Sequence, residues 1–192
     1  RPHDVDIAAQ IPHAALRVYV MGDRAVRREP ATAGDNAAMA ALAGEAMSAG
    51  ALGFSTSRNL SHRTKAGESI PTHGALEDEL LTIAMGARAG GEGVLELSSD
   101  FVGIAGDIPG EVALYRRLVE ATGMPLSIAI ALMNEEPDQC DQFVREIDAD
   151  LVGDALEIGL GGLEVGELAG EEVEALLDLA VLLGRHEVDR AK

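Results

Sequence analysis

The chain has 192 residues, of which 47% are hydrophobic and 25% are charged, and this composition is typical of a globular protein rather than of a disordered one. Its formal net charge of -18 argues against nucleic-acid binding, which needs clustered Lys and Arg. No apolar run reaches the roughly 20 residues of a membrane-spanning helix, so we expect no membrane partner. Cys140, the single cysteine, allows no intrachain disulfide and favours a reducing, cytoplasmic location.

Four apolar runs predict β-strands, and each is followed by a longer segment with helical spacing. The runs are centred at residues 16–20, 52–55, 94–97 and 126–131. This alternation predicts an α/β fold with βα units around a parallel sheet. Two architectures fit the spacing equally well: a partial (β/α)8 TIM-type barrel of about four βα units, or a small, open, doubly wound sheet.

Helix signals are clear in three of these units. The first helix is expected after Thr32, which can cap it with Asp35 three residues later, and it should end at Gly50. The second should run over about 76–91, with acids in its first turn and glycines at its end. The third should cover about 111–122, before Gly and Pro stop it.

The composition changes beyond about residue 134, where the chain becomes acidic and rich in Gly, Glu, Leu and Val. We predict an irregular stretch from Gly153 to Gly166 and a helix from Glu171 to Leu183. We therefore divide the chain into a partial barrel, residues 1–133, and an acidic C-terminal segment, residues 134–192. The composition shift and the absence of Met at the start suggest a truncated or frameshifted reading frame.

Several short motifs follow one another in a fixed order over about residues 5–133. They are the Asp-Val-Asp-Ile-Ala-Ala run at 4–9, Pro-His at 12–13 before Leu-Arg at 16–17, Val-Met-Gly at 20–22, and Gly-Ala-Leu-Gly-Phe-Ser-Thr at 50–56. The acidic helix start at 77–80 and Gly93-Val94 fit the same pattern. As an ordered set, these motifs resemble the N-acyl-D-amino-acid deacylase (D-aminoacylase) branch of the amidohydrolase superfamily.

This resemblance implies a (β/α)8 barrel that hydrolyses an amide or other C–N bond of a small molecule, an N-acyl amino acid or a related amide. It also implies a metal, usually zinc, at the carboxyl ends of the strands. Such a metal lowers the pKa of a bound water and polarises the scissile carbonyl.

The chain departs from its relatives where metal ligands are expected. One strand that normally ends in Ala-Thr-His here carries Ser98, and the next, normally ending in Ile-Ser-His, here carries Ile130. Neither side chain binds zinc in the way that His does. We therefore assign no metal ligand to this chain, and we expect that it binds no stoichiometric zinc.

The segment from Gly50 to Arg63 is the strongest pointer to function, because a buried strand here ends in hydroxyls, one His and two Arg. We predict that it lines a substrate pocket, with an arginine pairing with the substrate carboxylate. The alternative is a solvated loop with ordinary turn hydrogen bonds. The candidate substrate-binding residues are Ser55, Ser57, Arg58, His62 and Arg63, with Thr56 between them.

Three other residues have side chains that could take part in chemistry. Asp100 is a candidate catalytic acid/base or substitute ligand, against a loop or helix-capping carboxylate. His13 fits a packed, hydrogen-bonded residue better than a ligand. Cys140 lies among acids that would raise its pKa, and we interpret it as a bystander.

Three hypotheses about function remain open. The chain is a fragment or degenerate member of a C–N hydrolase, and it is inactive in isolation. Alternatively, it is a non-catalytic interaction module that self-associates through exposed sheet edges. In the third hypothesis, it is a truncated or frameshifted gene product of the same family.

Overall fold

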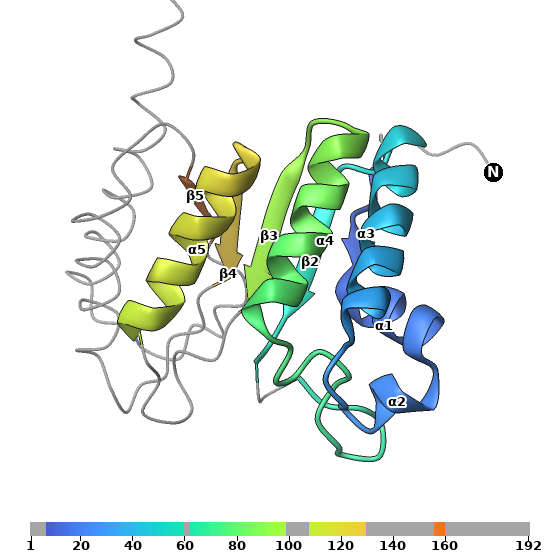
Figure 1. Cartoon of the computed structure of the whole chain (residues 1–192). Helices are drawn as coiled ribbons and strands as arrows, with labels where there is room; N and C mark the ends of the chain where they lie inside the picture. Colours follow the sequence, from blue (N-terminus) through green and yellow to red (C-terminus); the bar gives the residue numbers. More distant parts are fainter. Residues whose placement is uncertain (1–6, 60–61, 99–107, 130–155, 160–192) are drawn as a thin grey trace, which may run out of the picture.

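The computed structural model describes residues 7–59, 62–98, 108–129 and 156–159 (Figure 1). One parallel sheet runs through them, with its strands in the order β1-β2-β3-β4-β5. The strands are β1 (Ile11–Pro12), β2 (Gly53–Ser57), β3 (Val94–Ser98), β4 (Leu126–Ala129) and β5 (Leu156–Gly159). The helices are α1 (His13–Met21), α2 (Asp23–Val26), α3 (Ala33–Ser48), α4 (Glu77–Gly90) and α5 (Ile108–Thr122).

The strand order decides between the two predicted architectures. Each strand pairs with the next one along the chain, and the order never reverses. A doubly wound sheet reverses its order at a switch point, whereas a (β/α)8 barrel adds each new strand on the same side. Figure 1 shows α3, α4 and α5 side by side along the sheet. The prediction of a partial TIM-type barrel is confirmed.

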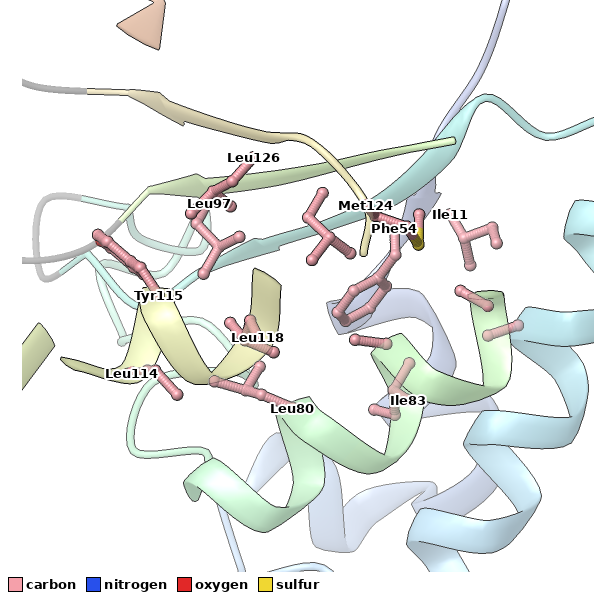
Figure 2. Packing of buried hydrophobic residues seen from close by; sticks show 14 of the residues in the cluster. Ile11, Phe54, Leu80, Ile83, Leu97, Leu114, Tyr115, Leu118, Met124 and Leu126 are labelled. Atoms are coloured by element: carbon pink, nitrogen blue, oxygen red, sulfur yellow. The ribbon is translucent and has the colours of Figure 1, made fainter. Parts of the chain in front are cut away.

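The hydrophobic core lies between the sheet and its helices (Figure 2). Phe54, Leu95 and Leu126 stand in register on neighbouring strands, and all three are buried. Phe54 and Leu126 face apolar side chains of α4 and α5 such as Leu80 and Leu118 (Figure 2), and Leu95 belongs to the same buried cluster. Because successive strand residues point to opposite faces, the intervening residues lie on the other side of the sheet.

That other side of the sheet is polar in the described strands. Ser55, Glu96 and Ser127 stand in register across β2, β3 and β4, and none of them is buried. Ser57 and Ser98 form the next row, at the carboxyl ends of their strands. We call this surface the serine face; it is the face that would line the interior of a closed barrel.

The capping residues in the sequence correctly predicted where α3 begins. Thr32 Oγ1 accepts from the Asp35 backbone N–H at 3.2 Å, and the Asp35 carboxylate accepts from the Thr32 N–H at 2.8 Å. This reciprocal pair satisfies two backbone donors that the helix itself cannot. The predictions of β2, β3, β4, α4 and α5 are confirmed as well.

Two predictions of local structure are wrong. Residues 16–20 form part of α1 rather than a strand, and the first strand is the shorter Ile11–Pro12. Val18 and Tyr19 favour strands, but both are exposed, whereas His13 and Arg17, four residues apart, are buried on one helix face. The stretch from 153 to 166 is also predicted to be irregular, but residues 156–159 within it form strand β5, which pairs with β4. The predicted helix at 171–183 lies outside the described residues, and the division at residue 133 stays a prediction.

Candidate functional site

A buried cluster of polar side chains lies behind the carboxyl end of β2. His13 Nδ1 is 2.8 Å from Thr56 Oγ1, and His13 Nε2 is 2.8 Å from Glu79 Oε1. Arg17 Nη1 donates to both carboxylate oxygens of Glu79, at 2.9 and 3.0 Å. Arg17 Nη2 donates to the Glu29 carbonyl at 2.6 Å. The cluster therefore connects α1, the segment after α2, β2 and α4.

Helix geometry brings these groups together. His13 and Arg17 are four residues apart in α1, so they lie on the same face of the helix. Glu79 lies in the first turn of α4 and belongs to its buried stripe with Leu80 and Ile83. An acid on an otherwise apolar stripe needs a partner, and Arg17 supplies it.

Burial decides the charge states in the cluster. Loss of solvent lowers the pKa of His13 below its ordinary value of 6.5, and this effect outweighs the opposing influence of Glu79. A neutral His13 then donates from Nε2–H to Glu79 and accepts the Thr56 hydroxyl at Nδ1. Hydroxyl, imidazole and carboxylate follow one another as in a catalytic triad, but Thr56 is only 8% exposed. This cluster supports the strand and does not present a nucleophile to solvent.

Ser57 forms a second hydroxyl–imidazole pair, on the opposite face of β2. Its Oγ lies 2.6 Å from Nδ1 of His62, and His62 is exposed. The backbone N–H of His62 donates to the Asn59 carbonyl at 3.3 Å. The Thr72 hydroxyl donates to the Ser57 carbonyl and ties the returning loop to the end of the strand.

The remaining predicted substrate-binding residues point in different directions. Ser55 lies on the serine face with Ser57. Arg58 turns toward the helices, where Nη2 is 3.1 Å from Glu111 Oε1 of α5. Arg63 is exposed, and its Nη1 donates to the Gly67 carbonyl at 3.1 Å. The structure thus brings Ser57 and His62 together and directs Arg58 elsewhere, while the binding role of all five residues stays a prediction.

The described residues do not fit a metal site. Nowhere among them do three or more His, Cys, Asp or Glu side chains gather closely enough to hold an ion. Both ring nitrogens of His13 already have hydrogen-bond partners, and β3 ends in Ser98, whose hydroxyl is not among the usual zinc ligands. We therefore derive no metal-dependent step from these side chains. Asp100, Ile130 and Cys140 lie outside the described residues.

Sequence reasoning missed Arg17 and Glu79, although a signal for each was present. Arg17 follows His13 by four residues, a spacing that pairs side chains on a helix. Glu79 falls on the stripe of residues 80, 83, 84 and 87, which the predicted helix would bury. The prediction that His13 is a packed, hydrogen-bonded residue is confirmed, although it begins a helix rather than lying in a strand.

The fold and the polar carboxyl edge of the sheet define part of a (β/α)8 enzyme barrel. A family model described as the amidohydrolase family matches residues 1–180. The chain therefore belongs to the amidohydrolase family, a family of hydrolases that act on small molecules and generally depend on a metal. The match extends beyond residue 133, where the sequence resemblance ended. Comparison with curated proteins and with solved structures gave no significant match.

None of the helices in the described part of the chain is both long and apolar enough to cross a membrane.

Proposed function

We propose that the chain derives from a hydrolase of the N-acyl-D-amino-acid deacylase type, which cleaves the amide C–N bond of N-acyl amino acids. The ordered motifs and the family membership support this proposal. The observation that carries it is the position of the Gly53–Ser57 motif. This motif forms β2, and it presents Ser55 and Ser57 on the serine face at the carboxyl edge, where barrel enzymes bind substrate.

Arg63 is the residue we propose as the receptor for the substrate carboxylate. It is exposed and lies in the same loop as His62, whereas the guanidinium of Arg58 is already paired with Glu111. Planar guanidinium groups bind carboxylates through two parallel hydrogen bonds. Asp100, shortly after β3, remains our candidate for the catalytic acid/base. Its place in the sequence, two residues after the last residue of β3, supports this role.

We also propose that residues 1–192 alone are inactive and bind no stoichiometric zinc. Ser98 and Ile130 at the expected ligand positions support this part of the proposal. The single cysteine supports a cytoplasmic location.

The test separates binding from turnover. The purified chain is incubated with N-acetyl-D-leucine or its L-enantiomer, with and without added zinc, while zinc content is measured by mass spectrometry. We expect no hydrolysis and no bound zinc. Hydrolysis of the D-substrate by a zinc-loaded chain would contradict the inactivity.

Binding is followed by amide chemical shifts of the labelled chain. We expect the D-enantiomer to shift residues 55–63 more than the L-enantiomer does, and R63Q to remove these shifts. K65Q is the matched control, because Lys65 is an exposed cation of the same loop. Equal effects of R63Q and K65Q, or shifts outside 55–63 alone, would contradict the substrate assignment.

A second candidate is a non-catalytic module that self-associates. The described sheet ends with β1 on one side and β5 on the other, and unpaired strand edges favour pairing with another chain. Light scattering coupled to size exclusion tests this candidate: a concentration-dependent dimer supports it, and a monomer at all concentrations excludes it.

A further inference from the structure

Ser57 and His62 form an accessible hydroxyl–imidazole pair that metal-dependent amide hydrolysis does not require. The distance of 2.6 Å between Ser57 Oγ and His62 Nδ1 is within the range over which a general base takes a proton from a nucleophile. Ser57 is partly exposed and His62 is exposed, so a substrate can reach both. The pair therefore has the access that the buried Thr56 and His13 lack.

The backbone holds both members of this pair in place. Ser57 is the last residue of β2, and its register opposite Ser98 fixes the direction of its side chain. The Asn59 N–H donates to Ser57 Oγ at 3.4 Å, and the His62 N–H donates to the Asn59 carbonyl at 3.3 Å. Groups that are positioned in advance lose less entropy on reaching the transition state.

We propose that Ser57 is a nucleophile toward acyl esters with good leaving groups and that His62 is its general base. Ser57 Oγ attacks the ester carbonyl carbon while its proton passes to Nδ1 of His62. The bond from the carbonyl carbon to the leaving oxygen breaks, and His62 returns the proton to that oxygen. Water, deprotonated by His62, then attacks the acyl-serine, which releases the carboxylic acid and restores the hydroxyl. The sum is ester plus water giving acid plus alcohol.

We assign activated esters as the substrate class. The described contacts supply a nucleophile and a base, but they assign no hydrogen-bond donor to the carbonyl oxygen that becomes negatively charged during the attack. The Asn59 N–H already points at Ser57 Oγ. Without strong oxyanion stabilisation, an ester must carry its own good leaving group to react. The step uses only the ester and water, so it goes beyond the proposed deacylase function and does not depend on it.

The test uses a fluorophosphonate probe on the purified full chain in the presence of a chelator. Attack by Ser57 Oγ forms an O–P bond and expels fluoride, and the His62 imidazole takes the proton. We expect one covalent adduct per chain, which peptide mass spectrometry places on Ser57. p-Nitrophenyl acetate should be hydrolysed by the same chain, with release of p-nitrophenol.

Three variants make the result specific. S57A should abolish labelling, and H62Q should slow it on the order of 100-fold, the usual contribution of a general base. S48A should react within about twofold of the wild-type rate, because Ser48 is an exposed serine of α3 whose hydroxyl donates to the Gly90 carbonyl. Circular dichroism checks that each variant is folded. If S57A does not fold, the labelling rate of H62Q alone tests the proposal.

An adduct on another residue, no adduct at all, or an unchanged rate in H62Q would overturn the proposal. Failure of the deacylase assay would leave it untouched, because labelling requires neither metal nor an N-acyl amino acid. The two proposals can thus fail separately.

Discussion

Thr56 and Ser57 are neighbours in β2, and each contacts a histidine, yet the two pairs lie in opposite environments. The alternation of side chains along a strand sends Thr56 toward the helices and Ser57 toward the serine face. Around Thr56 the imidazole is neutral, buried and fixed by Glu79. Around Ser57 the imidazole is exposed to solvent. The same two functional groups therefore support the fold on one face and remain available for chemistry on the other.

Removal of Glu79 should produce the largest effect. Glu79→Ala leaves the guanidinium of Arg17 buried without its carboxylate, which costs about 3–5 kcal/mol in the free energy of unfolding. Urea unfolding followed by circular dichroism measures this loss. Glu77→Ala is the matched control, because Glu77 lies two residues away in α4 and pairs with Arg117 at the surface. A loss for Glu79→Ala no greater than that of the control would show that the buried cluster does not stabilise the fold.

Substitutions at the two neighbouring hydroxyls test the comparison directly. Thr56→Val keeps the shape of the side chain but leaves Nδ1 of the buried His13 without its donor, at a cost of about 1–3 kcal/mol. Ser57→Ala should change the free energy of unfolding by less than about 0.5 kcal/mol, because its partner is exposed. Chemical unfolding of both variants under identical conditions gives the two values. Equal changes in the free energy of unfolding for the two variants would show that the buried pair stabilises the fold no more than the exposed pair does.

The pH dependence of stability should identify the buried histidine. Because the folded state lowers the pKa of His13, the unfolded chain binds a proton near pH 6.5 that the folded chain excludes. The stabilisation is complete above that pH and is lost as the pH falls, by at most about 1.4 kcal/mol per pH unit.

Urea midpoints between pH 8 and pH 5.5 measure this slope, and His13→Gln should flatten it. Asp35 does not interfere, because its ordinary pKa of 3.8 and its folded-state pKa of about 2, lowered first by the Arg24 guanidinium and then by Thr32, both lie below pH 5.5. An unchanged slope in His13→Gln would assign the dependence to another group.

A modest effect is expected at the ion pair of Arg58 with Glu111. Glu111→Gln removes the partner of a half-buried guanidinium, which should cost about 1 kcal/mol or less. Thermal unfolding against Glu120→Gln, an exposed acid of the same helix, measures the difference. If Glu111→Gln strengthens binding of N-acetyl-D-leucine, Arg58 competes with Arg63 for the substrate carboxylate. If binding is unchanged, Arg58 stabilises the fold through Glu111 and does not bind the substrate carboxylate.

Predictions that rest on neighbouring residues in the chain succeeded. The reciprocal cap of Thr32 and Asp35 located the start of α3, and acids followed by an apolar stripe located α4. Predictions that rest on composition alone were weaker. Val18, Tyr19 and Val20 suggested a strand, but burial of His13 and Arg17 on one face makes the segment a helix. The pairing of Ser57 with His62 could be anticipated only as membership of one loop.

The sequence by itself determined the alternation of strands and helices, the approximate positions of α3, α4 and β2 to β4, and the polar ending of β2. These features depend on side-chain periodicity and capping, which act over a few residues. Only the tertiary structure decided the strand order and the meeting of His13, Arg17, Thr56 and Glu79. It also separated Arg58 from Ser57. The physical reason is that these contacts join residues up to 66 positions apart, and burial of charge, rather than local propensity, selects the partners.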